Sequence, residues 1–377
     1  RNHVTLPHDT IVFMKTWEKL KSNPQLWELY FIREKIIKEI RLFFDKRGFH
    51  EVETPILIAH PAAESYLDVF ETTLLDRQRK PTKMYLSTSP EVALKKLLVA
   101  GIGNCYAITK SFRNMETQSN LHNPEFTILE WYRVGANYMD IMKDCEDLIS
   151  FIRPGLLKLK GRALTEKGSG LRAPKGLTPI SALHYQGQAI DLTPPWERVS
   201  VAEAFAKWAM INFDEFLDEE KAKQIAQKKG YRVEEGSTWE ELYNQIFLNE
   251  IEPRLGRGKP TFIYDFPSAM GALAKKKTSD PRFAERFEFY IAGLELGDCY
   301  SELTDVQEQE ERFKRELGEI KRLGKTVYDY DHDFIEALKV GLPMCSGIAV
   351  GVDRLVMLFA DTKDIADTMF FPMVEMK

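Results

Sequence analysis

The chain has 377 residues, of which 44% are hydrophobic and 29% are charged, so it is long enough to bury a large core under a well-solvated surface. A net charge of −5 argues against a protein that only coats nucleic acid, although the run Lys275-Lys276-Lys277 leaves a local RNA contact open. Four scattered cysteines without a C-x-x-C pair, no apolar run of about 18 residues and no signal-peptide pattern argue against zinc, disulfide frameworks, membrane spans and export, and they predict a cytoplasmic protein.

The first regular elements are predicted after an N-terminal tail of residues 1–27. Apolar residues then recur at helical spacing, and Gly48 ends this helix. Residues 50–58 predict a strand with Pro55 at a bend or edge. Residues 83–101 predict a strand, a polar turn and a second helix.

A hairpin and a long helix are predicted next. Residues 105–114 and 125–136 indicate two strands joined by the polar loop 115–124. Residues 138–152 place their apolar side chains on one face of a helix. This arrangement predicts a helix packed against an antiparallel pair.

The composition changes after Pro154, and we interpret residues from about 156 to 253 as an insertion. Its first part, residues 161–179, is rich in Gly, Lys and Pro and predicts a mobile surface segment. Its second part is charged and helical, with a capping box formed by Ser200 and Glu203. Strands return after residue 260, and a Gly-punctuated strand runs into a last apolar helix. The predicted fold class is therefore α+β, an antiparallel β-sheet flanked by helices.

Charged residues stand in several segments that otherwise predict buried structure. Arg113 ends a strand, and Arg354 opens the last helix. Taken singly, such residues fit ordinary roles: a solvated strand end, the wet face of a strand, or a helix cap. Together, two arginines and several carboxylates suit a triphosphate, because arginines neutralise phosphate oxygens and carboxylates hold Mg²⁺. Three glutamates recur at intervals of seven, the last two sharing one face if the chain folds back at Gly297: Glu288, Glu295 and Glu302.

These residues lie in three ordered segments that resemble the signature motifs of class II aminoacyl-tRNA synthetases of the lysine branch. "GFHEVETPIL" resembles motif 1, "SFRNMETQSNLHNPEFTILEWY" resembles motif 2, and "SGIAVGVDRLVML" resembles motif 3. The likeness covers residues 28–155 and 255–373. It implies a catalytic domain over residues 28–377 without an anticodon-binding domain, a homodimer formed through motif 1, and use of ATP, Mg²⁺ and lysine.

Within this branch, the chain most resembles the truncated synthetase paralogues that attach (R)-β-lysine to a lysine of elongation factor P. Residues 1–27 are too few for the OB-fold that reads an anticodon. The Gly-x-Gly-x-Gly of lysyl-tRNA synthetases reads Gly347-Ile-Ala349-Val-Gly351 here, and one methyl group on a pocket floor can change how an amino acid is seated. Two alternatives stay open: a minimal ligase that charges tRNA(Lys), and a non-catalytic synthetase-like module.

The resemblance also implies a role for each matching position. Arg113 and Arg354 would be catalytic, contacting the α-phosphate and the far end of the triphosphate. Glu130, Tyr132 and Glu302 would receive the side-chain ammonium, whose burial demands carboxylate partners. The implied contacts are Asn114, Glu116, Asn123, Glu295, Leu296 and Gly351 for ATP; Ser89, Pro90, Glu91, Glu130, Tyr132, Asp298, Tyr300, Glu302 and Ala349 for the amino acid; and Glu288 and Glu295 for Mg²⁺.

The chain departs from the family pattern at three places. Met115 follows Asn114 where the family usually has glutamate, so the adenine-contacting role would pass to Glu116. Asp298 stands where the relatives usually carry asparagine, and it adds a negative charge beside the amino acid site. The segment 161–179 is longer than the family pattern predicts, and no role is assigned to it.

Overall fold

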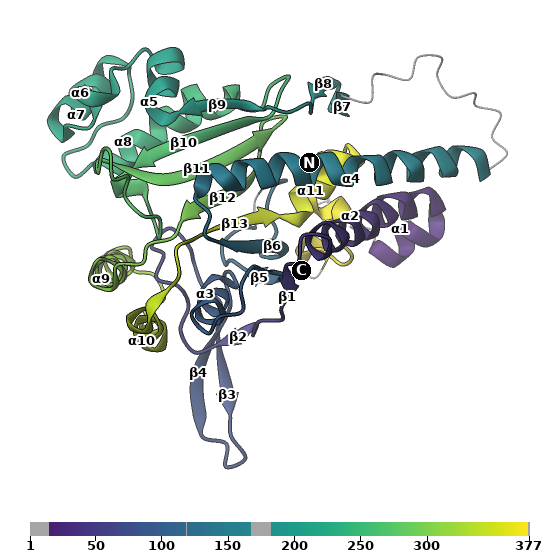
Figure 1. Cartoon of the computed structure of the whole chain (residues 1–377), viewed down its shortest axis with the longest axis horizontal. Coiled ribbons are helices and arrows are strands. Elements are labelled where there is room, and N and C mark those ends of the chain that lie inside the picture. Colours follow the sequence, from purple (N-terminus) through teal and green to yellow (C-terminus); the bar gives the residue numbers. More distant parts are fainter. Residues whose placement is uncertain (1–14, 118, 167–181, 376–377) are drawn as a thin grey trace, which may run out of the picture.

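The computed structural model in Figure 1 describes residues 15–117, 119–166 and 182–375. Its centre is one eight-stranded sheet, in which every neighbouring pair from β5 to β10 is antiparallel and β1 and β9 join the two edges in parallel. With helices packed on it, this sheet confirms the predicted α+β class. The strands, in spatial order, are β1 (His50–Glu51), β5 (Cys105–Phe112), β6 (Glu125–Val134), β13 (Cys345–Gly351), β12 (Leu294–Ser301), β11 (Phe283–Ile291), β10 (Thr261–Pro267) and β9 (Glu197–Ser200).

Three helices cover one face of the sheet: α2 (Trp27–Asp45), α4 (Tyr138–Glu166) and α11 (Val352–Ala360) (Figure 1). The predicted apolar stripe of α2 is buried here, including Phe43, and Gly48 follows the helix with a left-handed φ of 70°. Leu129 and Trp131 of β6 point into this core. Side chains alternate along a strand, so Glu130 and Tyr132 lie on the opposite face, where the candidate site is found.

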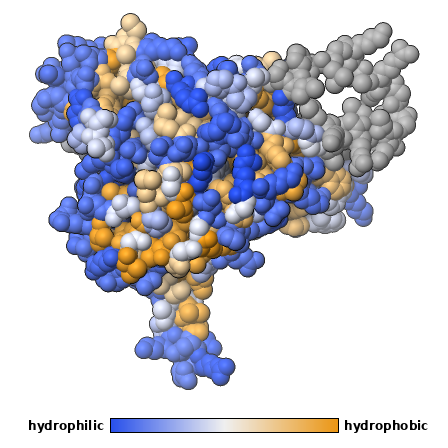
Figure 2. Space-filling view, in the orientation of Figure 1, coloured by the Kyte–Doolittle hydropathy of each residue, from blue (hydrophilic) through white to orange (hydrophobic). Residues whose placement is uncertain are grey.

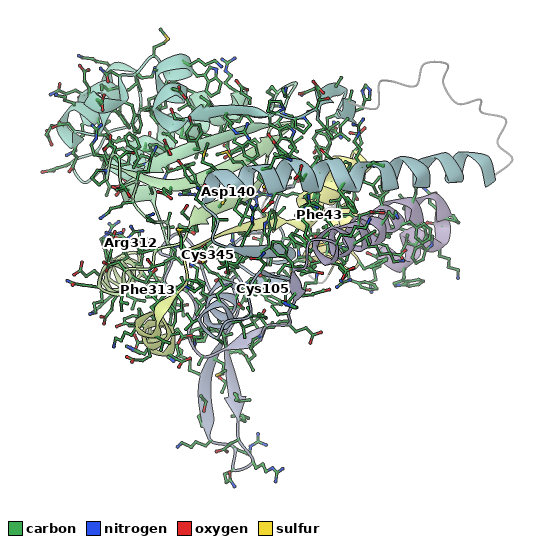
Figure 3. All side chains as sticks on the ribbon, in the orientation of Figure 1. Phe43, Cys105, Asp140, Arg312, Phe313 and Cys345 are labelled. Atoms are coloured by element: carbon green, nitrogen blue, oxygen red, sulfur yellow. The ribbon has the colours of Figure 1, made fainter. Side chains whose placement is uncertain are left out.

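A second core lies at one end of the sheet, beneath α3 (Glu91–Val99), α9 (Val306–Arg322) and α10 (His332–Gly341). Figure 3 labels three of its members, Cys105 of β5, Phe313 of α9 and Cys345 of β13. All four cysteines are buried with free thiols. This core fixes α3 against the strands that carry the site.

The predicted strand over residues 50–58 is interrupted at Pro55. Its two parts join different sheets, β1 in the main sheet and β2 (Leu57–Ile58) in a small sheet of order β2-β4-β3. Proline lacks the N–H that a continuous ladder needs, which accounts for the break. The other strands of the small sheet are β3 (Glu71–Leu75) and β4 (Pro81–Leu86), a hairpin that projects from the body of the molecule (Figure 1).

The segment that was interpreted as an insertion begins later than predicted. Helix α4 continues through Pro154 to Glu166, beyond the expected boundary near residue 156, and most of the predicted mobile segment lies outside the described residues. A small hairpin, β7 (Ala182–Tyr185) and β8 (Gln188–Asp191), leads to β9, which belongs to the main sheet. The predicted capping box of Ser200 and Glu203 is confirmed.

The rest of that segment is helical and has its own core. Two π-helical turns, Phe205–Ala209 and Phe247–Ile251, pack in this core with the four α-helices of the segment. Residues 252–254 end the segment as a short 3-10 turn and lead into β10. Its α-helices are α5 (Val201–Ala204), α6 (Phe213–Phe216), α7 (Glu219–Lys228) and α8 (Trp239–Ile246).

The N-terminal segment predicted as a tail contains a short helix. This helix, α1 (Thr16–Ser22), buries Leu20, and a 3-10 turn over Pro24–Leu26 leads into α2. Three further 3-10 turns occupy Ser268–Met270, Ile365–Thr368 and Met373–Glu375. None of the helices in the described ranges has the length and apolarity that a bilayer span requires.

Candidate active site

A cavity of about 170 Å³ opens on the face of the sheet opposite the α2–α4–α11 layer. Its walls come from β6, β12, β13, the start of α11 and the loop that precedes β6. The lining residues are Arg113, Glu116, Leu121, His122, Asn123, Phe126, Ile128, Glu295, Leu296, Gly297, Asp298, Ala349, Gly351, Asp353, Arg354 and Ile365. Most residues that were predicted to contact ATP are therefore brought together.

A larger, open groove of about 560 Å³ lies on the helical insertion. None of its lining residues is basic, so it offers no side chain that would bind a phosphate, and neither predicted arginine lines it. We therefore assign the chemistry to the smaller cavity. The groove is lined by Ala202, Glu203, Ala206, Met210, Ile211, Asn212, Phe213 and Asp214.

Arg113, just beyond the end of β5, presents its guanidinium to this cavity. Its Nε atom is buried and has no hydrogen-bond partner among the described residues. The guanidinium lies over the ring of Phe126, at 5.2 Å from the ring centroid. Burial disfavours its charge, but Tyr66, Glu64, Glu116 and Glu295 together outweigh burial and raise the pKa of Arg113. A buried cation with an unsatisfied donor is suited to an anionic ligand.

Arg354 reaches the cavity from the first turn of α11 and is held by four contacts. It donates to the carbonyl of Glu295 at 2.8 Å, to the carbonyl of Leu121 at 3.3 Å and to Nε2 of His122 at 2.8 Å, and it forms an ion pair with the Glu295 carboxylate at 3.3 Å. Burial and Arg354 lower the pKa of His122 to about 4, so the imidazole is neutral and accepts this bond. His122 is a site residue that the predicted set missed. Asp353, the residue before Arg354, forms an ion pair with Arg33 and so has a structural role.

The irregular Met115-Glu116 pair has a clear conformation. Met115 adopts a left-handed φ of 66° and is 75% exposed, so its side chain points away from the cavity. The chain reverses there, and Glu116 becomes a wall of the cavity, where Arg113 and Arg354 oppose the rise that burial causes in its pKa. The side-chain oxygen of Asn114 accepts from the Met115 amide at 2.9 Å and stabilises the turn.

Asn123 lines the cavity but uses its amide to fasten neighbouring segments. Its Nδ2 donates to the Glu125 carbonyl at 2.6 Å, and its Oδ1 accepts from the Met373 amide at 3.1 Å. The nucleotide contact predicted for Asn123 thus competes with two structural bonds.

The glutamates are arranged differently from the predicted pattern. Strands β11 and β12 are joined at Ala292-Gly293, both with left-handed φ, so the predicted fold-back at Gly297 is wrong. Gly297 lies inside β12, where an added Cβ would come within 2.7 Å of the Ala349 carbonyl. Its small size therefore serves strand packing. Glu288 and Glu295 lie on neighbouring strands, and Glu302 follows the far end of β12.

Asp298 belongs to an ion-pair network, so its charge is compensated. Its carboxylate accepts two bonds from Arg286, at 2.9 and 3.0 Å, and one from the Tyr300 hydroxyl at 2.6 Å. Arg286 also donates to Glu288 at 2.7 Å, and Tyr290 donates to the other oxygen of Glu288 at 2.8 Å. Arg286, absent from the predicted site, thus links the amino acid position to the predicted metal carboxylate.

A second buried cluster contains the predicted ammonium pocket. Tyr132 donates to Oε1 of Glu130 at 2.7 Å, while Oε2 of Glu130 and Oε1 of Glu302 have no hydrogen-bond partner among the described residues. Burial raises the pKa of Glu130 well above its ordinary value, and it raises the pKa of Glu302 to about 7 although Lys95 opposes the change. Unsatisfied acceptors of this kind favour a cationic ligand.

The sequence did not indicate that this cluster already holds a cation, Lys95. Its side chain is 1% exposed, and its Nζ pairs with Glu91 and lies 2.5 Å from Oε2 of Glu302. Burial lowers the pKa of Lys95, but Glu302 and Glu91 together outweigh burial and raise it, so the ammonium stays charged. With three carboxylates and one ammonium, the cluster remains short of positive charge.

The strand β13 forms the floor between the two clusters. Ala349 pairs with Asp298 on one side and Glu130 on the other, and it lines the cavity. Gly347 must be glycine, because a Cβ there would come within 2.2 Å of the Tyr132 ring. The remaining predicted substrate residues, Ser89 and Pro90, precede α3, and the Ser89 hydroxyl accepts from the Glu91 amide at 3.2 Å.

The run Lys275-Lys276-Lys277 does not form an uncompensated basic patch. Each lysine is paired with a carboxylate: Lys275 with Glu285 at 3.7 Å, Lys276 with Glu308 at 2.9 Å, and Lys277 with Asp265. An RNA contact would have to compete with these pairs.

The sequence model of the family described as "tRNA synthetases class II (D, K and N)" matches residues 10–375. A lysine–tRNA ligase of Moorella thermoacetica is 36% identical over 360 residues, which cover 94% of this chain and 67% of that protein. Lysine–tRNA ligases of Thermoanaerobacter pseudethanolicus and Carboxydothermus hydrogenoformans are 35% and 36% identical, over 97% and 96% of this chain and 68% of each relative.

Proposed function

Because the chain belongs to the class II tRNA synthetases of the D, K and N group, we propose that it activates lysine or (R)-β-lysine as an adenylate and transfers it to a lysine of elongation factor P. Membership of this family makes the chain an ATP-dependent aminoacylating ligase that uses ATP and Mg²⁺. The isomer, the acceptor, a cytoplasmic location and the role of each residue belong to the proposal.

One observation carries the assignment of the substrates. On the same face of the sheet lie a buried donor, Nε of Arg113, and buried acceptors on Glu130 and Glu302 that have no hydrogen-bond partner in the part of the chain that the structure describes. Such atoms are costly to bury unless a ligand satisfies them. An amino acid with a cationic side chain and a nucleotide with an anionic chain would satisfy both ends.

The Mg²⁺ ion that this family uses would be held by Glu288 and Glu295. No group of three or more His, Cys, Asp or Glu side chains in the described ranges forms a complete metal site. Two carboxylates suit Mg²⁺ nevertheless, because this ion retains water and takes further ligands from phosphate oxygens, whose negative charge it offsets. Burial raises the pKa of Glu288 to about 8 against the effect of Arg286, so a bound cation would favour its ionised form.

In the first step, a carboxylate oxygen of the amino acid attacks the α-phosphorus of ATP. A new oxygen–phosphorus bond forms, the bond to the bridging oxygen breaks, and pyrophosphate leaves with the bonding electrons. Arg113 would neutralise the charge on the α-phosphate and align the attacking carboxylate, and Arg354 would bind the far end of the triphosphate. The Phe126 ring offers an apolar face for the base.

In the second step, the neutral amine of an acceptor lysine attacks the carbonyl carbon of the adenylate. The carbon–nitrogen bond forms, AMP departs with the electrons of the broken carbon–oxygen bond, and the amine proton passes to solvent. The acceptor amine needs no anticodon contact. A second candidate acceptor, the ribose hydroxyl of tRNA(Lys), is favoured by the names of the relatives, which are lysine–tRNA ligases.

ATP–pyrophosphate exchange and acceptor labelling test the proposal. The protein is incubated with ATP and either radiolabelled lysine or (R)-β-lysine, and tRNA(Lys) and elongation factor P are offered in parallel. We expect exchange with at least one isomer and label in elongation factor P. Label in tRNA alone would establish the second candidate, and absence of exchange with either isomer would refute both ligases.

Ala349→Gly is expected to shift the preference of the enzyme toward α-lysine. The methyl group lies on the cavity floor between Asp298 and Glu130. Removing it would make room for the amine of α-lysine, which is one carbon nearer to the substrate's own carboxylate than the amine of β-lysine. We expect a change of about 10-fold in the ratio of kcat/KM for α-lysine over (R)-β-lysine, measured by pyrophosphate exchange. An unchanged ratio would show that the methyl group does not discriminate the isomers.

The chain is also expected to form a homodimer through motif 1 and the small sheet. Ile56 and Leu57, which follow Pro55, are 39% and 41% exposed, and Leu74 and Leu75 of the projecting hairpin are 49% and 48% exposed. Figure 2 shows hydrophobic surface along the projecting hairpin above a hydrophilic tip. Light scattering at micromolar concentration should give the mass of a dimer, and Leu74→Asp with Leu75→Asp should shift it to a monomer. A monomeric wild-type protein would contradict this expectation.

A further inference from the structure

We propose that Asp298 keeps Glu288 available for the divalent cation of the proposed reaction, because Asp298 binds the arginine, Arg286, that would otherwise neutralise Glu288. Asp298 is thus a positioning residue of the proposed metal site, and not the amino acid contact that the motif resemblance implies. The inference deepens the proposed function and rests on it. It concerns a position at which this chain departs from the family pattern.

The register of β11 and β12 places the two carboxylates opposite each other. Glu288 of β11 pairs with Asp298 of β12, and Arg286 pairs with Tyr300, two positions away on each strand. Residues two apart on a strand share a face, so these four side chains lie together on one face of the sheet. Asp298 lines the cavity, and Glu288 lies on the neighbouring strand.

Two carboxylates that face each other across neighbouring strands repel, and burial strengthens the repulsion. The side chains of Glu288 and Asp298 are only 12% and 24% exposed, so water screens their charges poorly. Arg286 compensates this repulsion, because its guanidinium forms an ion pair with both carboxylates. One positive charge is shared by two negative charges, and the group of three side chains keeps one negative charge.

Arg286 divides its hydrogen bonds unequally between the two carboxylates. Its Nε and Nη2 donate to the two oxygens of Asp298 at 2.9 and 3.0 Å, which is the strong two-bond geometry of an arginine–carboxylate pair. A single bond from Nη2, at 2.7 Å, reaches Glu288. Glu288 is therefore the carboxylate that loses less when it turns from the arginine to a metal ion.

Arg286 and Asp298 are also held by other neighbours. The Nη1 atom of Arg286 donates to the carbonyl of Met270, and the guanidinium lies over the ring of Phe266, 4.3 Å from the ring centroid. The Tyr300 hydroxyl donates to Asp298 at 2.6 Å. With the two bonds from Arg286, three of the roughly four acceptor positions of this carboxylate are occupied. Asp298 therefore contributes charge and orientation, and it has little capacity left for a substrate.

The second carboxylate of the proposed metal site is paired with an arginine as well. Glu295 lines the cavity and forms an ion pair with Arg354 at 3.3 Å. Glu288, Glu295 and Asp298 carry three negative charges, and the two arginines that pair with them carry two positive charges. One negative charge thus remains to attract a divalent cation. It is lost when Asp298 is made neutral, because Arg286 then pairs with Glu288 alone.

Asp298→Asn tests the proposal, because asparagine keeps the shape of the side chain and removes its charge. Mn²⁺ serves as the probe, since it prefers the same oxygen ligands as Mg²⁺ and electron paramagnetic resonance detects the free ion. The protein is titrated with Mn²⁺ in the presence of a non-hydrolysable ATP analogue. We expect the dissociation constant of Mn²⁺ to rise about 10- to 100-fold. The dissociation constant of the metal-free analogue should not rise, because removing a negative charge does not repel phosphate. Asp298→Ser removes the same charge with a smaller side chain and should give the same loss.

The variant Glu288→Gln shows whether Asp298 acts through Glu288. Adding Asp298→Asn to this variant should weaken Mn²⁺ binding by a much smaller factor than it does in the wild-type background, because the carboxylate that Asp298 protects is already absent. Equal factors in the two backgrounds would mean that Asp298 acts on the ion directly, and they would overturn its role through Arg286.

Asp144→Asn is the matched control. Asp144 also accepts two bonds from one arginine, Arg133, at 3.0 and 3.1 Å, and neither residue lines the cavity. Its affinity for Mn²⁺ should equal that of wild type, and circular dichroism should show that all variants are folded. An unchanged dissociation constant for Mn²⁺ in folded Asp298→Asn would overturn the inference alone. Absence of both pyrophosphate exchange and Mn²⁺ binding in the wild-type protein would instead end the proposed function, and this inference with it.

Discussion

Lys95→Met is expected to destabilise the folded chain by about 3–5 kcal/mol, because it leaves buried carboxylates without their cation. Methionine fills a similar volume, so the loss reports charge and not a cavity. Lys95 is 1% exposed and pairs with Glu91 and Glu302, while Glu130 adds a third carboxylate nearby. Urea unfolding followed by circular dichroism measures the change in the free energy of unfolding.

The loss should depend on pH in a defined direction. Without Lys95, Glu302 and Glu130 would fold in the protonated form, because burial already raises the pKa of both groups and Lys95 opposes that rise. A folded pKa above the unfolded one contributes stability that is present at low pH and is lost as pH rises through the folded pKa. The variant should therefore be closest to wild type near pH 5 and weakest above pH 7.

The adjacent lysine provides the matched control. Lys96 pairs with Asp331 at 2.8 Å and Asp333 at 2.6 Å, but its side chain is 27% exposed. Lys96→Met should cost less than about 1 kcal/mol, as surface ion pairs usually do. If the two substitutions lowered the free energy of unfolding equally, the charge of Lys95 would not be required to stabilise the buried carboxylates.

Arg113→Ala is expected to reduce pyrophosphate exchange by about 10³-fold or more while leaving the fold intact. Removing a preorganised cation withdraws its stabilisation of charge that develops at the α-phosphorus. The fold should tolerate the change, because Nε of Arg113 has no protein partner among the described residues and its main contact is the face of Phe126. Exchange rates with saturating ATP and lysine provide the measurement.

Arg47→Ala is a suitable control for the loss of one arginine. Arg47 follows α2, away from the cavity, and forms an exposed pair with Asp147 at 3.2 Å. Exchange in this variant should equal that of wild type. If Arg113→Ala also retained wild-type exchange with a native circular dichroism spectrum, the catalytic role assigned to Arg113 would have to be abandoned.

The architecture could be read from the sequence where local pattern and burial agree. The hairpin of β5 and β6 is an example: two segments of strand character joined by a polar loop predicted it, and the two strands pair in antiparallel register. The break at Pro55 and the end of α2 at Gly48 follow from the backbone chemistry of single residues. Motif resemblance then supplied the roles that pattern alone leaves open.

Contacts between distant segments could not be derived in the same way. Lys95 occupies a helix, where a lysine normally faces water, and only its i,i+4 spacing from Glu91 hinted at a pair. Nothing in the local sequence indicates that Glu302, more than two hundred positions later, completes the cluster. The fold-back at Gly297 failed because a glycine needed for close packing resembles one needed for a turn.

The anchoring of the motif 2 loop has a practical consequence for protein engineering. Asn123 holds the Met373 amide, and the carbonyl of Asn120 accepts from the Ile365 amide at 2.8 Å. Two hydrogen bonds therefore join this loop to the last turns of the described chain, although more than two hundred residues separate them in sequence. A chimaera that exchanges this loop between related ligases should carry its own C-terminal segment with it.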